Sequence, residues 1–222
     1  MNEFVTGQHF SGLTRFTFNN AKQDPSYVNQ CIGYDLFRRA GIPAPRCNFA
    51  NIHVNGEDLG LFVHVESIKK PYLRNHFASD EGNLYEGTLS DFREGWTKTF
   101  EKKTNSTEPA RPEIDQISEA LELEGDAMRD ALDAIVDMDA FMTFWAMEAL
   151  VAHHDGYSGN SNNFYVYGTP DQSNRNITFM PWGVDNLFRD SPSGPDVTYS
   201  LAYATGTLRP FAKPRRVRSS NE

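Results

Sequence analysis

The polar segment HHDGYSGNSNNFYVYG at residues 153–168, with ITFMPWGVD at residues 177–185, decides the fold and the candidate chemistry of this chain. Two runs rich in aromatic and β-branched residues, Phe164 to Tyr167 and Ile177 to Met180, predict a pair of strands joined as a hairpin. Because a hairpin reverses the direction of the chain, it should carry Asp185 back toward the polar loop that precedes the first strand.

Helices are predicted before this segment. Apolar residues recur with a period of 3.6 from Ile114 to Val136, after a polar break from Asn105 to Pro112. Asp139 is a candidate cap for a further helix that runs to Ala152 and is apolar nearly all round. Such a helix is expected at the centre of a lobe.

The first half of the chain is predicted to be rich in strands. Asp24 and Pro25 favour a helix start, and the helix continues at apolar spacing to Ala40. Asn55-Gly56 between two β-rich runs predicts a hairpin, because both turn positions need a positive φ. The remaining predictions are strands at Gly12 to Asn19, Cys47 to Val54, Leu59 to Val65, Asn83 to Glu86 and Trp96 to Lys102, and a short helix at Lys69 to Phe77.

The order of these elements predicts an α+β fold. A small, sheet-rich lobe with a hinge is expected at residues 1–104, and a helical lobe with the loop and hairpin at residues 113–208. The basic tail at residues 209–222 is predicted to be solvated and disordered, with docking or phosphate binding as the alternative.

Composition narrows the classes of function. The chain has 222 residues and a net charge of −9, which argues against a nucleic-acid-binding surface. No apolar run reaches the roughly 18 residues that a membrane span requires. Cys31 and Cys47 are interpreted as small core residues with reduced thiols.

Asp155, Asn163 and Asp185 follow the order that phosphoryl transfer requires: an acid and an amide on one loop, then a second acid after a hairpin. The alternative for Asp155 and Asn163 is that they are ordinary turn residues. His153 and His154 suggest a His-Asp metal phosphohydrolase, but the other histidines are scattered, so structural histidines at a helix end are the better interpretation.

Several separate blocks of sequence carry a recognisable pattern. The blocks are YDLFRRAGIPAPR at 34–46, VNGEDLGLFVHVE at 54–66, GNLY at 82–85, HDGY at 154–157 through NNFYVY at 162–167, and FMPWGVD at 179–185. In this order, and over about residues 12 to 190, the chain resembles the spore-coat protein H (CotH) kinase family.

This resemblance implies a protein-kinase-like fold and transfer of phosphate from ATP, with Mg²⁺ or Mn²⁺, to Ser and Thr hydroxyls of proteins, including coat or surface proteins. It assigns Asp155 as the catalytic acid, and Asn163 and Asp185 as metal ligands. It also implies that Val65 and Glu66 lead into the hinge that binds the cofactor.

The chain also departs from the family pattern. Gly183 stands where family members often have an acid. The strand with the phosphate-holding Lys is expected before Met1, and a Pro/Gly-rich stretch and the basic tail stand where helices are expected after Leu187, so the chain looks truncated at both ends. The alternative is a non-catalytic coat or surface interaction module, for which Tyr157, Tyr165 and Tyr167 are the expected exposed aromatic residues. The compartment stays open between spore coat, cytoplasm and export.

Overall fold

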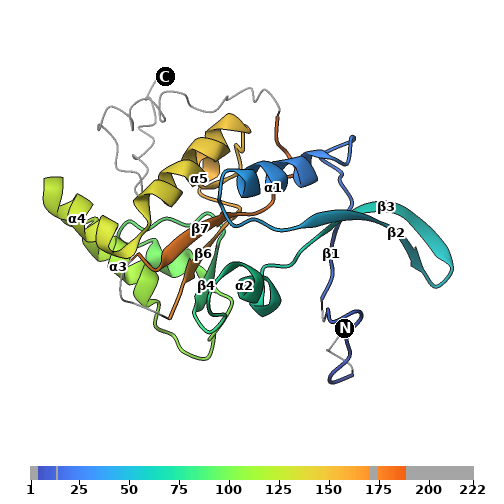
Figure 1. Cartoon of the computed structure of the whole chain (residues 1–222), viewed down its shortest axis with the longest axis horizontal. Coiled ribbons are helices and arrows are strands. Elements are labelled where there is room, and N and C mark those ends of the chain that lie inside the picture. The colour runs from blue at the N-terminus through green and yellow to red at the C-terminus, as the bar shows by residue number, and fades with distance from the viewer. Residues whose placement is uncertain (1–4, 14, 171–174, 189–222) are drawn as a thin grey trace, which may run out of the picture.

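The computed structural model describes residues 5–13, 15–170 and 175–188, which form a mixed α and β structure with two antiparallel sheets (Figure 1). The expected α+β class is therefore confirmed at this level. The basic tail expected at residues 209–222 lies outside the described residues.

The first sheet has the strand order β1-β3-β2. Its hairpin turns at Asn55 and Gly56 with φ of 53° and 87°, as the sequence predicts. The hairpin projects away from the body of the molecule (Figure 1). The strands are β1 at Thr17–Asn19, which is shorter than the predicted run from Gly12, β2 at Cys47–Val54 and β3 at Glu57–Val65.

Helix α1, Asn29–Arg39, follows β1 and begins later than the sequence suggests. The carboxylate of Asp24 still satisfies its first amide, because Asn29 N donates to Asp24 Oδ2 at 2.8 Å. The prediction of reduced thiols is wrong: Cys31 of α1 and Cys47 of β2 form a disulfide, with Cα atoms 5.1 Å apart. The strand and the helix bring the two thiols within bonding reach, which sequence spacing does not reveal.

The second sheet has the strand order β5-β4-β6-β7. Strands β6 and β7 form the predicted hairpin, with Phe164 opposite Pro181. The sheet combines strands from both sides of residue 104. The strand predicted at Trp96 to Lys102 is shorter than expected: a 3₁₀ turn, η1, forms at Thr97–Thr99, and only Glu101–Lys102 is a strand. The strands of this sheet are β4 at Asn83–Gly87, β5 at Glu101–Lys102, β6 at Phe164–Gly168 and β7 at Ile177–Pro181.

Helices cover this second sheet. The cap of α5 differs from the prediction: the helix begins at Met138, so Asp137 rather than Asp139 lies at the capping position and accepts from Ala140 N at 3.1 Å. The helices are α2 at Lys70–His76, α3 at Pro112–Ala120, α4 at Gly125–Ile135, α5 at Met138–Leu150 and α6 at Tyr157–Asn160.

The core lies between α1, α5 and the second sheet. Phe141 and Phe144 of α5 pack with Phe179 of β7, with ring centroids 4.8 and 5.9 Å apart. The expectation of exposed tyrosines is wrong, because Tyr157, Tyr165 and Tyr167 are 2%, 5% and 0% exposed. Their rings supply too much apolar area to leave the core of so small a domain.

Candidate functional site

The loop between α5 and β6 is organised around the carboxylate of Asp155. Asn160 Nδ2 donates to Asp155 Oδ1 at 2.8 Å, and the amides of Asn162 and Asn163 donate to Oδ2 at 3.2 and 2.7 Å. Asn163 has a φ of 50°, a left-handed conformation that asparagine tolerates better than most residues. The asparagines that sequence analysis treats as possible turn formers thus fix the orientation of this carboxylate.

Glu148 of α5 binds backbone amides of the same loop. Sequence analysis did not identify it as a site residue. Its side chain, buried in α5, accepts from Tyr157 N at 3.0 Å and from Ser158 N at 2.6 Å. His153 Nδ1 lies 3.4 Å from the same carboxylate. An acid among the apolar residues of the second half of this helix is the signal that could have revealed it, since a buried carboxylate needs partners.

The hairpin places Asn163 directly against Gly183. Trp182 N donates to Asn163 O at 3.0 Å. A Cβ atom added to Gly183 would lie 2.7 Å from both Cγ and Oδ1 of Asn163, and Gly183 has a φ of 55°. The close approach of the two segments therefore depends on a glycine at this position.

Asp185, two residues further on, is held by the end of β1. Asn19 Nδ2 donates to Asp185 Oδ2 at 3.0 Å and also lies 3.3 Å from Gln30 Oε1 of α1. Burial raises the pKa of the neighbouring Tyr34 phenol, and the negative charge of Asp185 adds to the shift. These contacts fix Asp185 between β1, α1 and the end of the hairpin.

A cleft of about 420 Å³ opens beside these residues. It is bounded by the first sheet on one side and by Trp182 and Gly183 on the other, and Asn19 lies in its wall. Its lining is Thr17, Phe18, Asn19, Asn20, Gln30, Phe62, Val65, Trp182 and Gly183. The volume falls within the range of sites for small molecules and cofactors.

The two expected hinge residues, Val65 and Glu66, line different cavities. Val65 lines the cleft, whereas the Glu66 side chain lies in the wall of a second, larger cavity. There Glu66 pairs with Arg46 at 2.6 Å. Burial acts to raise the pKa of Glu66, but the bonds from Arg46 outweigh it and the pKa is lowered. The structure thus brings Asp155, Asn163, Asp185 and Val65 to one region, with Glu66 facing elsewhere.

The donor atoms at this site suit a hard cation. Asn163 Nδ2 is occupied by Asp155, which leaves Asn163 Oδ1 and the Asp185 carboxylate as oxygen donors. Among the described residues there is no group of three or more His, Cys, Asp or Glu side chains that could hold a metal ion. Magnesium is commonly bound through one or two carboxylates together with substrate phosphates, so the small protein ligand set fits that ion.

Comparison with known proteins places the chain in a family. The profile described as CotH kinase protein matches residues 2–209. The chain belongs to this family. The CotH assignment covers nearly the whole sequence, including both segments that form the candidate site.

Individual relatives are distant. The chain is similar to the inner spore coat protein H of Bacillus subtilis (strain 168), with 24% identity over 82% of this chain and 52% of that protein. It is also similar to the invasins CotH7 and CotH3 of Rhizopus delemar, with 24% and 22% identity over 91% and 82% of this chain. Those matches cover 37% and 33% of the invasins, so the chain spans about half or less of these relatives.

Proposed function

We propose that this chain carries ATP- and metal-dependent phosphoryl transfer to Ser and Thr hydroxyls of proteins, in a protein-kinase-like fold. One observation carries the proposal: the Asn163 side chain bonds to Asp155 at 2.7 Å while lying against Gly183, two residues from Asp185. Asn163 thereby links the loop of Asp155 to the segment that carries Asp185, next to Gly183 in the wall of the cleft. Membership of the CotH family supports the same assignment.

In this proposal the residues have distinct roles. Asp155, held by three amides, would orient the acceptor hydroxyl and accept its hydrogen. Asn163 and Asp185 would hold Mg²⁺ or Mn²⁺, and Val65 would contact the nucleotide in the cleft. The metal, when bound, would neutralise charge on the transferring phosphate.

The proposed partners and location follow from the relatives and from the disulfide. The names of the relatives point to coat and surface proteins as acceptors. A disulfide between Cys31 and Cys47 favours an oxidising compartment, so we propose a coat or exported location. Within the described residues, no helix is long and apolar enough to cross a membrane.

A second candidate is a non-catalytic coat or surface module of the same fold. Protein kinases need a Lys on a strand paired with a Glu on the helix that flanks the nucleotide. Among the described residues that line the candidate cleft, none is a Lys or an Arg. This lack of a phosphate-holding cation favours the module, whereas the burial of the three tyrosines removes the other argument for it. The His-Asp phosphohydrolase is not carried forward, because the described residues hold no suitable ligand group.

The first prediction concerns Asp185. Replacement of Asp185 by Asn should abolish metal-dependent ATP turnover by the 222-residue chain, because it removes a charged ligand while nearly preserving shape. The measurement is release or transfer of labelled phosphate in the presence of Mg²⁺ or Mn²⁺. The matched control is Asp130→Asn on the exposed surface of α4, which should leave turnover unchanged. Turnover that survives in the Asp185 variant would refute the metal assignment.

A further inference from the structure

A second cavity of about 840 Å³, to which Glu66 contributes, has no role in the proposed function. It lies between α2, the segment after β5 and the end of the first sheet at which β2 begins and β3 ends. Asn19, Trp182 and Gly183 of the candidate cleft do not line it. Its lining consists of Leu13, Arg15, Arg46, Cys47, Asn48, His64, Glu66, Ser67, Lys69, Lys70, Pro71, Tyr72, Asn75, Lys103, Thr104 and Asn105.

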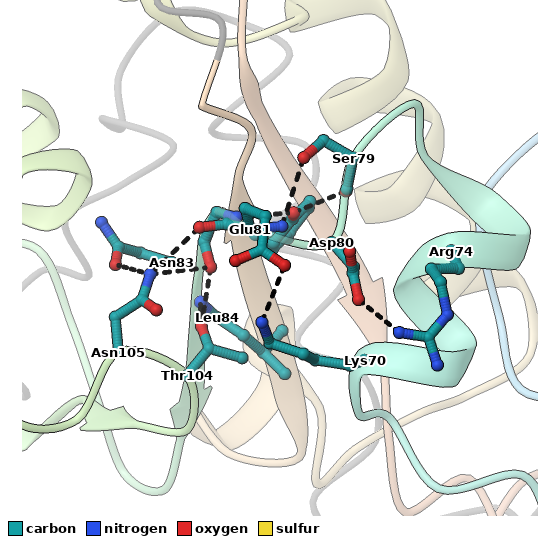
Figure 2. A network of polar contacts seen from close by, with 11 residues as sticks. Lys70, Arg74, Ser79, Asp80, Glu81, Asn83, Leu84, Thr104 and Asn105 are labelled. Atoms are coloured by element: carbon teal, nitrogen blue, oxygen red, sulfur yellow. Dashed lines mark hydrogen bonds and ion pairs between the residues drawn. The ribbon is translucent and has the colours of Figure 1, made fainter.

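The wall of this cavity formed by Thr104 and Asn105 is fixed in place by a network of polar contacts (Figure 2). Thr104 Oγ1 donates to Gly82 O at 2.7 Å and accepts from Leu84 N at 2.8 Å. Asn105 Nδ2 donates to Glu81 O and to the side-chain oxygen of Asn83, both at 3.1 Å. The wall therefore exists before any ligand binds, which lowers the cost of binding.

The cavity gathers cations in a chain that is acidic overall. Five of its lining residues are Lys or Arg and one is an acid. Three of the cations are neutralised: Arg46 by Glu66 at 2.6 Å, Lys70 by Glu81 at 2.9 Å, and Lys103 by Glu86 and Glu101 at 2.5 and 2.7 Å. The five cations and the four acids paired with them leave one net positive charge, and Arg15 and Lys69 are the cations outside these ion pairs.

Arg15 and Lys69 are the cations that a ligand would meet. In the part of the chain that the structure describes, neither forms an ion pair with a carboxylate. Burial lowers the pKa of the Lys69 amine, the positive charges of Arg15 and Lys103 lower it further, and the negative charges of Glu86 and Glu101 only partly oppose the shift. Like charges close together repel each other, and an anion bound between them would relieve that repulsion.

The rest of the lining indicates what kind of anion fits. Leu13 and Pro71 give the cavity an apolar part, and Tyr72 is also among its lining residues. Tyr72 is fully buried, and its hydroxyl has no hydrogen-bond partner among the described residues. A free inorganic ion would leave this apolar part without contact, whereas a phosphate ester on an apolar group would use both.

We propose that this cavity binds a small organic phosphomonoester, with its phosphate at Lys69 and Arg15 and its apolar group against Leu13 and Pro71. The Lys69 ammonium and the Arg15 guanidinium can both form charge-assisted hydrogen bonds to a phosphate, and the guanidinium can form two parallel bonds to phosphate oxygens. The site is separate from the proposed nucleotide cleft and does not depend on catalysis there.

The test uses phenyl phosphate as the probe and calorimetric titration of the 222-residue chain as the measurement. Phenyl phosphate should bind more tightly than inorganic phosphate, and phenol should not bind. Lys69→Gln should weaken phenyl phosphate binding at least about tenfold, since it removes a charge-assisted bond. Lys69→Arg keeps the charge and should retain binding, and Lys98→Gln, an exposed residue outside the cavity, is the matched control.

Three results would overturn the proposal. The first is equal affinity of the Lys69→Gln and Lys98→Gln variants, with circular dichroism showing that both are folded. The second is equal affinity for phenyl phosphate and inorganic phosphate. The third is displacement of phenyl phosphate by ATP with Mg²⁺, which would make this cavity the nucleotide site. Failure of the Asp185 experiment would leave these results untouched, because Asp185 does not line the cavity.

Discussion

At the scale of single residues, the candidate site depends on amides as much as on acids. Asn160, Asn162 and Asn163 orient Asp155, and Asn19 orients Asp185. A neutral amide can fix a carboxylate in place without cancelling its charge, as an ion pair would do. Among the described residues, neither of these acids is paired with a cation.

Residue-scale electrostatics also predict a pH effect at Glu66. Its folded-state pKa lies below the ordinary value of 4.5 because of the bonds from Arg46. The pair therefore stabilises the fold above pH 4.5, and this contribution is lost as the pH falls through the lowered folded-state value. Glu66→Gln should reduce the free energy of unfolding by roughly 0.5–1 kcal/mol at pH 7, since the Arg46 side is well exposed to solvent.

The measurement is urea unfolding of the parent and Glu66→Gln proteins at pH 7 and pH 3. The difference in unfolding free energy between the two proteins should be smaller at pH 3 than at pH 7. A control is Glu119→Gln on the exposed face of α3, which should show no difference at either pH. If the difference in unfolding free energy between the parent and Glu66→Gln instead grew as the pH fell, the lowered pKa of Glu66 would be contradicted.

At the scale of elements, α1 is the part that connects the site to the first sheet. A Cβ atom added to its Gly33 would lie 2.3 Å from Leu187 Cδ1, so the helix packs closely on the segment after the hairpin. Its other side is joined to β2 through the disulfide between Cys31 and Cys47. The position of α1, and with it that of Gln30 and Tyr34 beside Asp185, is thus fixed from two directions.

The disulfide gives a prediction for this element. The two cysteines are 16 residues apart, and replacing both by Ser should reduce the free energy of unfolding by about 3 kcal/mol through the loss of a constraint on the unfolded chain. The measurement is denaturant unfolding of the parent and the double variant without reductant. Dithiothreitol should lower the stability of the parent to that of the variant and leave the variant unchanged. Equal stability of the oxidised parent and the variant would show that the bond does not form.

At the scale of the whole molecule, the site lies where the two sheets and α1 meet (Figure 1). Trp182 packs against both hydrophobic clusters of the molecule and also lines the candidate cleft. A ligand in this cleft would contact the first sheet, Gln30 of α1 and the segment that follows β7. Ligand binding and global stability should therefore be linked.

This link separates the enzyme from the non-catalytic module. ATP with Mg²⁺ should raise the melting temperature of the 222-residue chain by several degrees at about 100 times its Kd, since binding at that level adds about 2.7 kcal/mol. Thermal melting with and without EDTA is the measurement. The Asp185→Asn variant should lose the metal-dependent part of the shift. No shift under any of these conditions would favour the coat or surface module.

The sequence by itself determined the local elements and the order of the acids. The Asn55-Gly56 turn, the β6–β7 hairpin and the buried face of α5 follow from turn chemistry and apolar spacing, which act between near neighbours. The resemblance carried by the quoted blocks led to the CotH family, which the comparison confirms.

Only the tertiary structure decided which side chains meet across long distances. Asn19 lies 166 positions from Asp185, and no local pattern predicts that its amide orients that acid. The disulfide, the burial of the tyrosines and the cluster of Arg15 and Lys69 likewise depend on the packing of separate elements. Spacing along the chain encodes periodicity, whereas contacts between distant segments are set by how the elements pack, and this is why the sequence could not reveal them.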